Sequence, residues 1–221
     1  MRSPFSLPYL LLFLLALGFL VSFVQIGLLT ISFAKLGLSP GSAYLLLIAS
    51  LLGSALNIPL FSIPAERPPP DAILRAHGLL RAGFMQFTGR TVIAVNVGGA
   101  LIPLLFSGYL LTHNPLGPGQ VAIALAVVAA VSYWWSRPLP GVGIAMPIFV
   151  APVTAALVAV GIGGPQSAPL AYIAGTMGVL IGADLLRLRD IQRMGVPVAS
   201  IGGAGTFDGI FMTGLVAVLL A

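Results

Sequence analysis

The feature that most constrains this chain is a series of long apolar runs separated by short connections. They cover roughly residues 8–34, 42–63, 91–112, 119–136, 141–162, 168–186 and 201–221. A helix needs about 20 mostly apolar residues to cross the hydrocarbon core of a bilayer. We therefore predict an all-α fold, a polytopic transmembrane bundle of about seven spans that forms a single domain over residues 1–221, with the lipid bilayer as its main partner.

Composition excludes several other classes of protein. With 58% hydrophobic and 7% charged residues, the chain has no room for a sizeable extramembrane domain. The net charge of +5 comes from Lys and Arg residues scattered between the apolar runs, so nucleic acid is not an expected partner. The absence of cysteine rules out disulfides and thiolate metal sites, and we expect neither a metal nor a cofactor. The oligomeric state is left open.

The positions of the basic residues predict the orientation, because Lys and Arg remain in cytoplasmic loops. With the N-terminus inside, Lys35 alone falls on the outer side, and the connections at 113–119 and 161–167 carry no Lys or Arg. The predicted topology is N-in and C-out. The inner loops then contain Arg67, Arg75, Arg81, Arg90, Arg137, Arg187, Arg189 and Arg193.

The loop between the second and third runs is long enough to hold a short helix of its own. Asp71 follows three prolines and is a suitable helix cap. Residues 71–87 combine apolar side chains with Arg75 and Arg81, a pattern typical of a helix lying in the headgroup plane.

Two acidic residues carry the functional prediction. Asp184 and Asp208 fall inside the sixth and seventh runs, where an isolated carboxylate is costly and marks a functional site by default. Both lie near the inner ends of antiparallel neighbours, and small residues around them permit close approach. If the carboxyl groups meet, they share one proton, so that one activates water while the other polarises a carbonyl. Gly202, Gly203 and Gly205 would shape the approach to Asp208, and Asn96 and Pro147 would wall the cavity.

This arrangement resembles the presenilin and signal-peptide-peptidase type of intramembrane diaspartyl protease. Those enzymes carry one catalytic Asp on each of their sixth and seventh helices, in Tyr-Asp and Gly-x-Gly-Asp motifs, followed by Pro-Ala-Leu. Here the sequences are Gly182-Ala183-Asp184 and Phe207-Asp208, so the two motif types are exchanged, and no Pro-Ala-Leu follows. The resemblance implies cleavage of transmembrane or hydrophobic peptide substrates.

A longer resemblance covers most of the chain. The segment IGGAGTFDGIFMTGL from Ile201, together with GVGIAMP from Gly141, is similar to an uncharacterised family of bacterial and archaeal multipass proteins. That resemblance implies a prokaryotic inner (cytoplasmic) membrane location and assigns no activity.

Two alternatives remain open. In the first, the aspartates bind a proton or a cation in an ion-coupled transporter or channel, beside unwound backbone such as the Gly-Gly-Ala-Gly stretch. In the second, both are structural: Asp184 pairs with Arg187, and Asp208 is buried, protonated and hydrogen-bonded to Asn96 or Thr206.

Overall fold

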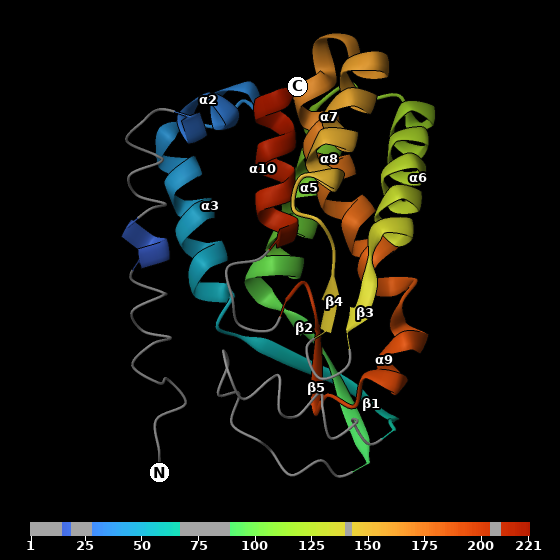
Figure 1. The fold of residues 1–221 in the computed structure, drawn as a ribbon. Helices are drawn as coiled ribbons and strands as arrows, with labels where there is room; N and C mark the ends of the chain where they lie inside the picture. The colour runs from blue at the N-terminus through green and yellow to red at the C-terminus, as the bar shows by residue number, and fades with distance from the viewer. Residues whose placement is uncertain (1–14, 19–27, 67–88, 140–142, 204–208) are drawn as a thin grey trace.

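The computed structural model describes residues 15–18, 28–66, 89–139, 143–203 and 209–221. Within them, apolar helices gather at one end of the molecule and short strands at the other (Figure 1). The α-helices are α2 (Leu28–Lys35), α3 (Pro40–Gly53), α5 (Ile102–His113), α6 (Pro118–Trp135), α7 (Val150–Gly163), α8 (Ser167–Val179), α9 (Leu188–Met194) and α10 (Gly209–Leu220). Residues 15–18 are also helical, and the described chain further contains two π-helical turns, η1 (Val97–Leu101) and η3 (Leu180–Leu185), and one 3-10 turn, η2 (Gly164–Gln166).

Two helical stretches of the described chain are long and apolar enough to cross a membrane, judged by length and composition. They are Pro118–Trp135 and Val150–Leu185, and the second reverses direction at Gly164, where φ is +52°. Three further apolar helices, Pro40–Gly53, Val97–His113 and Ile210–Leu220, are shorter. The predicted helix at 119–136 is confirmed as α6. The structure thus shows a mostly helical protein, and the full count of seven spans stays a prediction.

The prediction of an all-α fold is wrong at the other end of the molecule. Strand β1 (Asn57–Pro64) runs antiparallel to β2 (Arg90–Asn96), and β5 (Val198–Ile201) runs parallel to β2, giving the order β1-β2-β5. A second pair, β3 (Arg137–Leu139) and β4 (Gly143–Ala145), is antiparallel. The expected helices at 42–63 and 91–112 are therefore each part helix and part strand, because hydropathy alone does not separate an apolar strand from an apolar helix.

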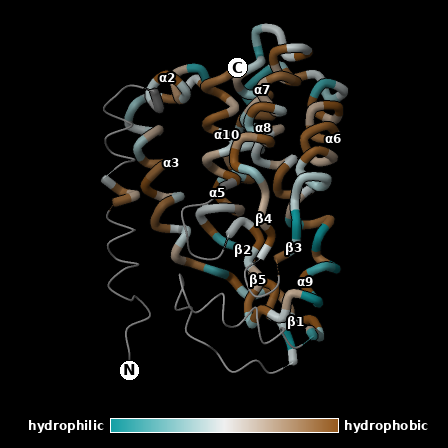
Figure 2. Tube along the Cα trace, viewed as in Figure 1, coloured by the Kyte–Doolittle hydropathy of each residue, from teal (hydrophilic) through white to brown (hydrophobic). Residues whose placement is uncertain are grey.

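Local chemistry explains where α3 stops and β1 begins. Pro59 and Pro64 lack the N–H that a helix interior requires, and the helix ends at Gly53 before either is reached. Proline is tolerated at the edge of a sheet, and β1 is the edge strand here. The hydropathy tube shows the same division: apolar residues dominate the helices, and hydrophilic ones cluster around the strands and α9 (Figure 2).

Helix α8 is the centre of the helical end. It packs against α5, α6, α7 and α10, and the side chains from Leu170 to Ala174 are completely buried. Small residues let its backbone approach α6 closely. A methyl group at Gly182 would lie 2.2 Å from the carbonyl oxygen of Ala129, and one at Gly178 would lie 2.7 Å from Val128. Two backbones in such contact leave little freedom for the turn that follows α8.

Three predicted features lie wholly or partly outside the described residues. They are the interfacial helix at 71–87, most of the first run, and the segment that contains Gly205 and Asp208.

Candidate functional site

Asp184 belongs to the π-helical turn η3, which continues α8 toward the strand end of the molecule. A π turn holds one more residue than an α turn, and such turns recur at functional sites. The side chain of Asp184 is partly buried, and its Oδ2 accepts a hydrogen bond of 2.9 Å from the backbone N–H of Gly202. The structure therefore joins the sixth apolar run to the start of the seventh at this carboxylate.

Gly202 is held in a conformation that other residues avoid. Its φ is +81°, and a methyl group there would lie 2.6 Å from the Ala100 Cβ and 2.7 Å from the Ala100 backbone nitrogen. Glycine alone accommodates both the left-handed backbone and this contact without strain. The position of the Gly202 N–H, which donates to Asp184, is thus fixed by the packing of the end of β5 against η1.

A hydrogen-bonded group lies beside this junction, made of the side chains of Asn57, Asn96 and Ser200 and the backbone carbonyl of Ser54, and we call these four residues the amide cluster. Asn96 Nδ2 donates to the Ser54 carbonyl oxygen at 2.8 Å and to Asn57 Oδ1 at 3.1 Å. The hydroxyl of Ser200 also donates to Asn57 Oδ1. The side-chain oxygen Oδ1 of Asn57 therefore connects the edge strand β1 to both parallel strands, β2 and β5.

Asn96 has a second role as the cap of the π turn η1. Its Oδ1 accepts a 2.7 Å hydrogen bond from the backbone N–H of Gly99, satisfying a donor that the helix start leaves free. The prediction placed Asn96 in the wall of a cavity. In the structure Asn96 is buried, and its amide donates to the Ser54 carbonyl oxygen and to Asn57 Oδ1, while the cavity role stays a prediction.

The parallel strands β2 and β5 end in the same way. β2 ends within the sequence Asn96-Val97-Gly98-Gly99, and β5 ends within Ser200-Ile201-Gly202-Gly203. Each strand then leads through its glycine pair toward a helix, α5 or α10, at the other end of the molecule. The polar residue before each glycine pair bonds Asn57, so this repeated sequence was the signal that could have revealed the amide cluster.

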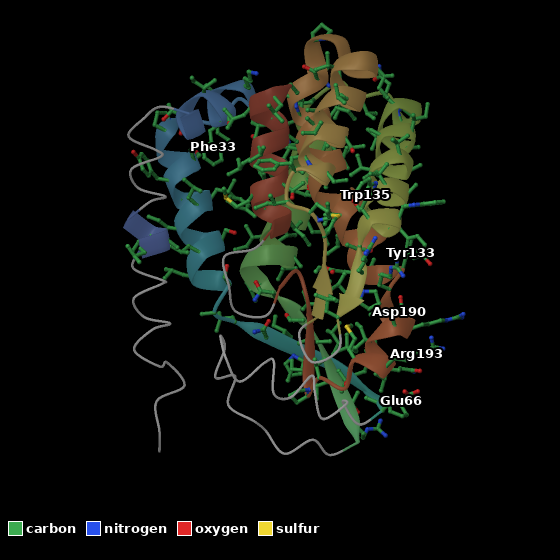
Figure 3. All side chains as sticks on the ribbon, viewed as in Figure 1. Phe33, Glu66, Tyr133, Trp135, Asp190 and Arg193 are labelled. Carbon is green, nitrogen blue, oxygen red and sulfur yellow. The ribbon has the colours of Figure 1, made fainter. Side chains whose placement is uncertain are left out.

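Arg187, three residues beyond Asp184, ties η3 to the end of α6. Its guanidinium donates to the carbonyl oxygens of Tyr133 at 2.7 Å and Ser136 at 2.9 Å, and lies 4.1 Å above the Tyr133 ring. It also forms an ion pair of 3.0 Å with Asp190. Figure 3 shows Tyr133, Trp135 and Asp190 along this side of the molecule. The structural alternative paired Arg187 with Asp184; in the structure its carboxylate partner is Asp190.

The remaining predicted site residues are distributed as follows. Pro147 is exposed in the turn between β4 and α7, and Gly203, with φ of +100°, donates its N–H to the Ser200 carbonyl oxygen at 3.1 Å. Asp208 and Gly205 lie outside the described residues. Two residues after Asp208, Ile210 is buried in one apolar cluster with Ala151, Val179 and Ala183, next to Asp184 in the chain.

The described residues offer no group of three or more His, Asp or Glu side chains placed to hold a metal ion. The pocket found among them lies between α2 and α3 and is lined by apolar side chains, away from Asp184. What the site itself provides is a partly buried carboxylate in the π turn η3, held by one backbone amide at the end of β5.

The fold and the site define a mostly helical, strongly apolar protein with small sheets at one end and a carboxylate at the junction. The chain belongs to the family described as "Protein of unknown function (DUF1614)", whose sequence model matches residues 51–220. This confirms the expected membership of a family without an assigned activity. No curated protein and no solved structure matches the chain. The resemblance to diaspartyl proteases stays a prediction.

Proposed function

We propose that this protein is an integral membrane hydrolase of the prokaryotic inner membrane, which cleaves peptide bonds of membrane-embedded substrates with Asp184 and Asp208. The observation that carries the proposal is the hydrogen bond between Asp184 Oδ2 and the Gly202 N–H. It brings the first aspartate to the glycine-rich stretch that leads to the second.

A second contact supports the same pairing from the other side. Ile210, in the first turn of α10, shares a buried cluster with Ala183, the residue before Asp184. The segment containing Asp208 is thus bounded by two described residues, Gly202 and Ile210, and both lie beside η3. A chain anchored at both ends next to one carboxylate is a favourable setting for a second carboxylate to reach it.

The chemistry of such a pair is acid–base catalysis. The ionised carboxylate takes a proton from a water molecule, and the water oxygen attacks the carbonyl carbon of the scissile bond. The protonated carboxyl group donates a hydrogen bond to the carbonyl oxygen, and a proton passes to the departing amide nitrogen as the C–N bond breaks. One water is consumed, and a carboxylic acid and an amine are formed.

The distribution of charge supports a membrane location and an orientation. Among the described residues, Arg90, Arg137, Arg187, Arg189 and Arg193 belong to the strands, to α9 or to the turn before it, at one end of the molecule. At the other end, the connections between α5 and α6 and between α7 and α8 contain no Lys or Arg. This asymmetry favours a strand end that faces the cytoplasm.

The test is cleavage of a single-span substrate in liposomes that contain the purified protein. We expect Asp184→Asn and Asp208→Asn each to abolish cleavage while the variants keep the melting temperature of the wild type. Glu66→Gln is the matched control, because Glu66 is exposed at the strand end and its replacement should leave cleavage unchanged. Full cleavage by either aspartate variant would show that the two residues are not the catalytic unit.

A second candidate, an ion-coupled transporter or channel, is favoured by the interrupted segments. The chain passes from helix to strand after α3 and from strand to helix at β2–η1–α5, and the amide cluster lies at these breaks. Broken helices with polar groups at the break are the architecture of ion sites in transporters. This candidate predicts proton or sodium flux into proteoliposomes that Asp184→Asn abolishes, in the absence of any peptide cleavage.

A further inference from the structure

The depth of Asp184 in the membrane follows from the contacts that its chain neighbours Gly182 and Arg187 make with α6 and with Ser136 at its end. This helix has 18 residues, and at 1.5 Å per residue it is about 27 Å long, close to the thickness of the hydrocarbon core. Its last two residues, Trp134 and Trp135, are 83% and 53% exposed. Exposed tryptophan at the end of a spanning helix marks the level of the lipid headgroups.

Contacts on both sides of Asp184 link it to that end of α6. A methyl group at Gly182 would lie 2.2 Å from the Ala129 carbonyl oxygen and 2.9 Å from the Ser132 Cβ. Arg187 donates to the carbonyl oxygens of Tyr133 and Ser136. Asp184 lies between these two contacts in the chain, so its level along the bundle is that of the last two turns of α6, which end at the two tryptophans.

The groups that follow in the chain are polar. Ser136, Arg187 and Asp190 form one hydrogen-bonded group beyond the end of α6, and Arg189 and Arg193 are exposed on α9 (Figure 3 labels Asp190 and Arg193). Charged side chains of this kind belong in the headgroup region and the water beyond it. The carboxylate of Asp184 is partly exposed, and these charged groups begin three residues beyond it on the strand side.

We propose that the substrates are polypeptides with an extended segment at the cytoplasmic end of a hydrophobic helix, and that cleavage occurs at this boundary. The inference rests on the proposed function. Cleavage requires an unwound peptide, and unwinding inside hydrocarbon leaves backbone N–H and C=O groups without partners. At the boundary, water provides those partners, and the same water supplies the nucleophile.

Cleavage mapping in liposomes tests the position of the scissile bond. A single-span substrate is cleaved by the purified protein, and the fragment masses identify the bond. We expect this bond within about one helical turn, 3.6 residues, of the inner end of the hydrophobic helix. In a second substrate, four leucines added at the inner end should move the cleaved bond by four residues. Cleavage at a bond near the middle of the helix would refute cleavage at the boundary but would still agree with the proposed protease activity. No cleavage, or cleavage that persists in Asp184→Asn, would overturn both.

A depth measurement gives a result that does not depend on activity. The chain has no cysteine, so a single nitroxide label can be attached to Leu186→Cys, an exposed site two residues after Asp184. Leu157→Cys is the matched control, because Leu157 is exposed halfway along α7. We expect a water-soluble nickel complex to relax the label at 186 several-fold more strongly than the label at 157. Equal relaxation would place Asp184 at the depth of the hydrocarbon core and refute the inference.

Discussion

Gly182→Ala is the substitution that tests the packing of the site most directly. In an ordinary helix interior, alanine is more stable than glycine by about 0.5–1 kcal/mol. Here the new methyl group would lie 2.2 Å from the carbonyl oxygen of Ala129 and 2.9 Å from the Ala129 carbonyl carbon. Neither is the end of a flexible side chain, so the backbones of η3 and α6 must separate by about 1 Å in an interior that is otherwise close-packed.

The cost of this separation decides whether Gly182→Ala raises or lowers the stability of the protein. Overpacking a well-packed interior costs about 1–3 kcal/mol, and forcing two backbones apart belongs at the upper end of that range. After the gain in helix propensity, we expect a net loss of about 2 kcal/mol. For a chain of this size, the melting temperature should fall by about 4–8 °C.

Intrinsic fluorescence provides the assay. Trp134 and Trp135 are the two tryptophans of the chain, and both lie in the last turn of the helix against which Gly182 packs. Thermal unfolding in detergent micelles, followed by their emission, reports stability at this contact. Gly161→Ala is the control, because a methyl group there meets no heavy atom within 4 Å, and it should melt at or slightly above the wild-type temperature. If Gly182→Ala melts no lower than this control, the close approach of η3 and α6 is refuted.

Three other substitutions test the neighbouring contacts by the same unfolding measurement. Asn96→Ala removes the cap of η1 and should cost about 1–2 kcal/mol, and an unchanged melting temperature would argue against the capping role. Arg187→Gln releases the carbonyl groups at the end of α6 and should lower stability by about 1–3 kcal/mol, together with a shift in tryptophan emission. Gly202→Ala adds a contact with Ala100 to an unfavourable φ and should cost about 2–5 kcal/mol. Gly37→Ala is the control, because Gly37 has a φ of +74° with open space around it, so that the substitution reports the cost of the backbone conformation alone. Equal losses of stability at positions 37 and 202 would refute the contact between Gly202 and Ala100.

Part of the fold was predictable because a long apolar run without interruptions favours a helix. The run at 119–136 matches α6 within one residue at each end, since it is mostly apolar and no glycine or proline interrupts its interior. The run at 42–63 was misassigned because Ile58, Leu60 and Phe61 are as apolar as a helix would require. Their strand is defined by pairing with β2, more than thirty residues away along the chain, and no local pattern reports such a pairing.

The site was predictable to a similar degree. A charged residue inside an apolar run identified Asp184 without any structural information, because the cost of burying a carboxylate is local chemistry. Its contact with Gly202 depends on the left-handed backbone of that glycine and on the packing of β5, η1 and η3. In the sequence, the only sign of this arrangement is a pair of glycines. One alternative from the sequence paired Arg187 with Asp184, since residues three apart face each other in a regular helix; η3 is not a regular helix, and Arg187 pairs with Asp190.

The direction in which the Asp184 carboxylate points depends on the number of residues in the π turn η3. Removing one residue of η3 that precedes Asp184 would restore ordinary helical winding and rotate the carboxylate by about 100° around the helix axis, away from the end of β5. Homologous chains should therefore keep the length of this stretch as well as the glycine at 182 and the carboxylate at 184. Insertions and deletions are the changes that selection should exclude here.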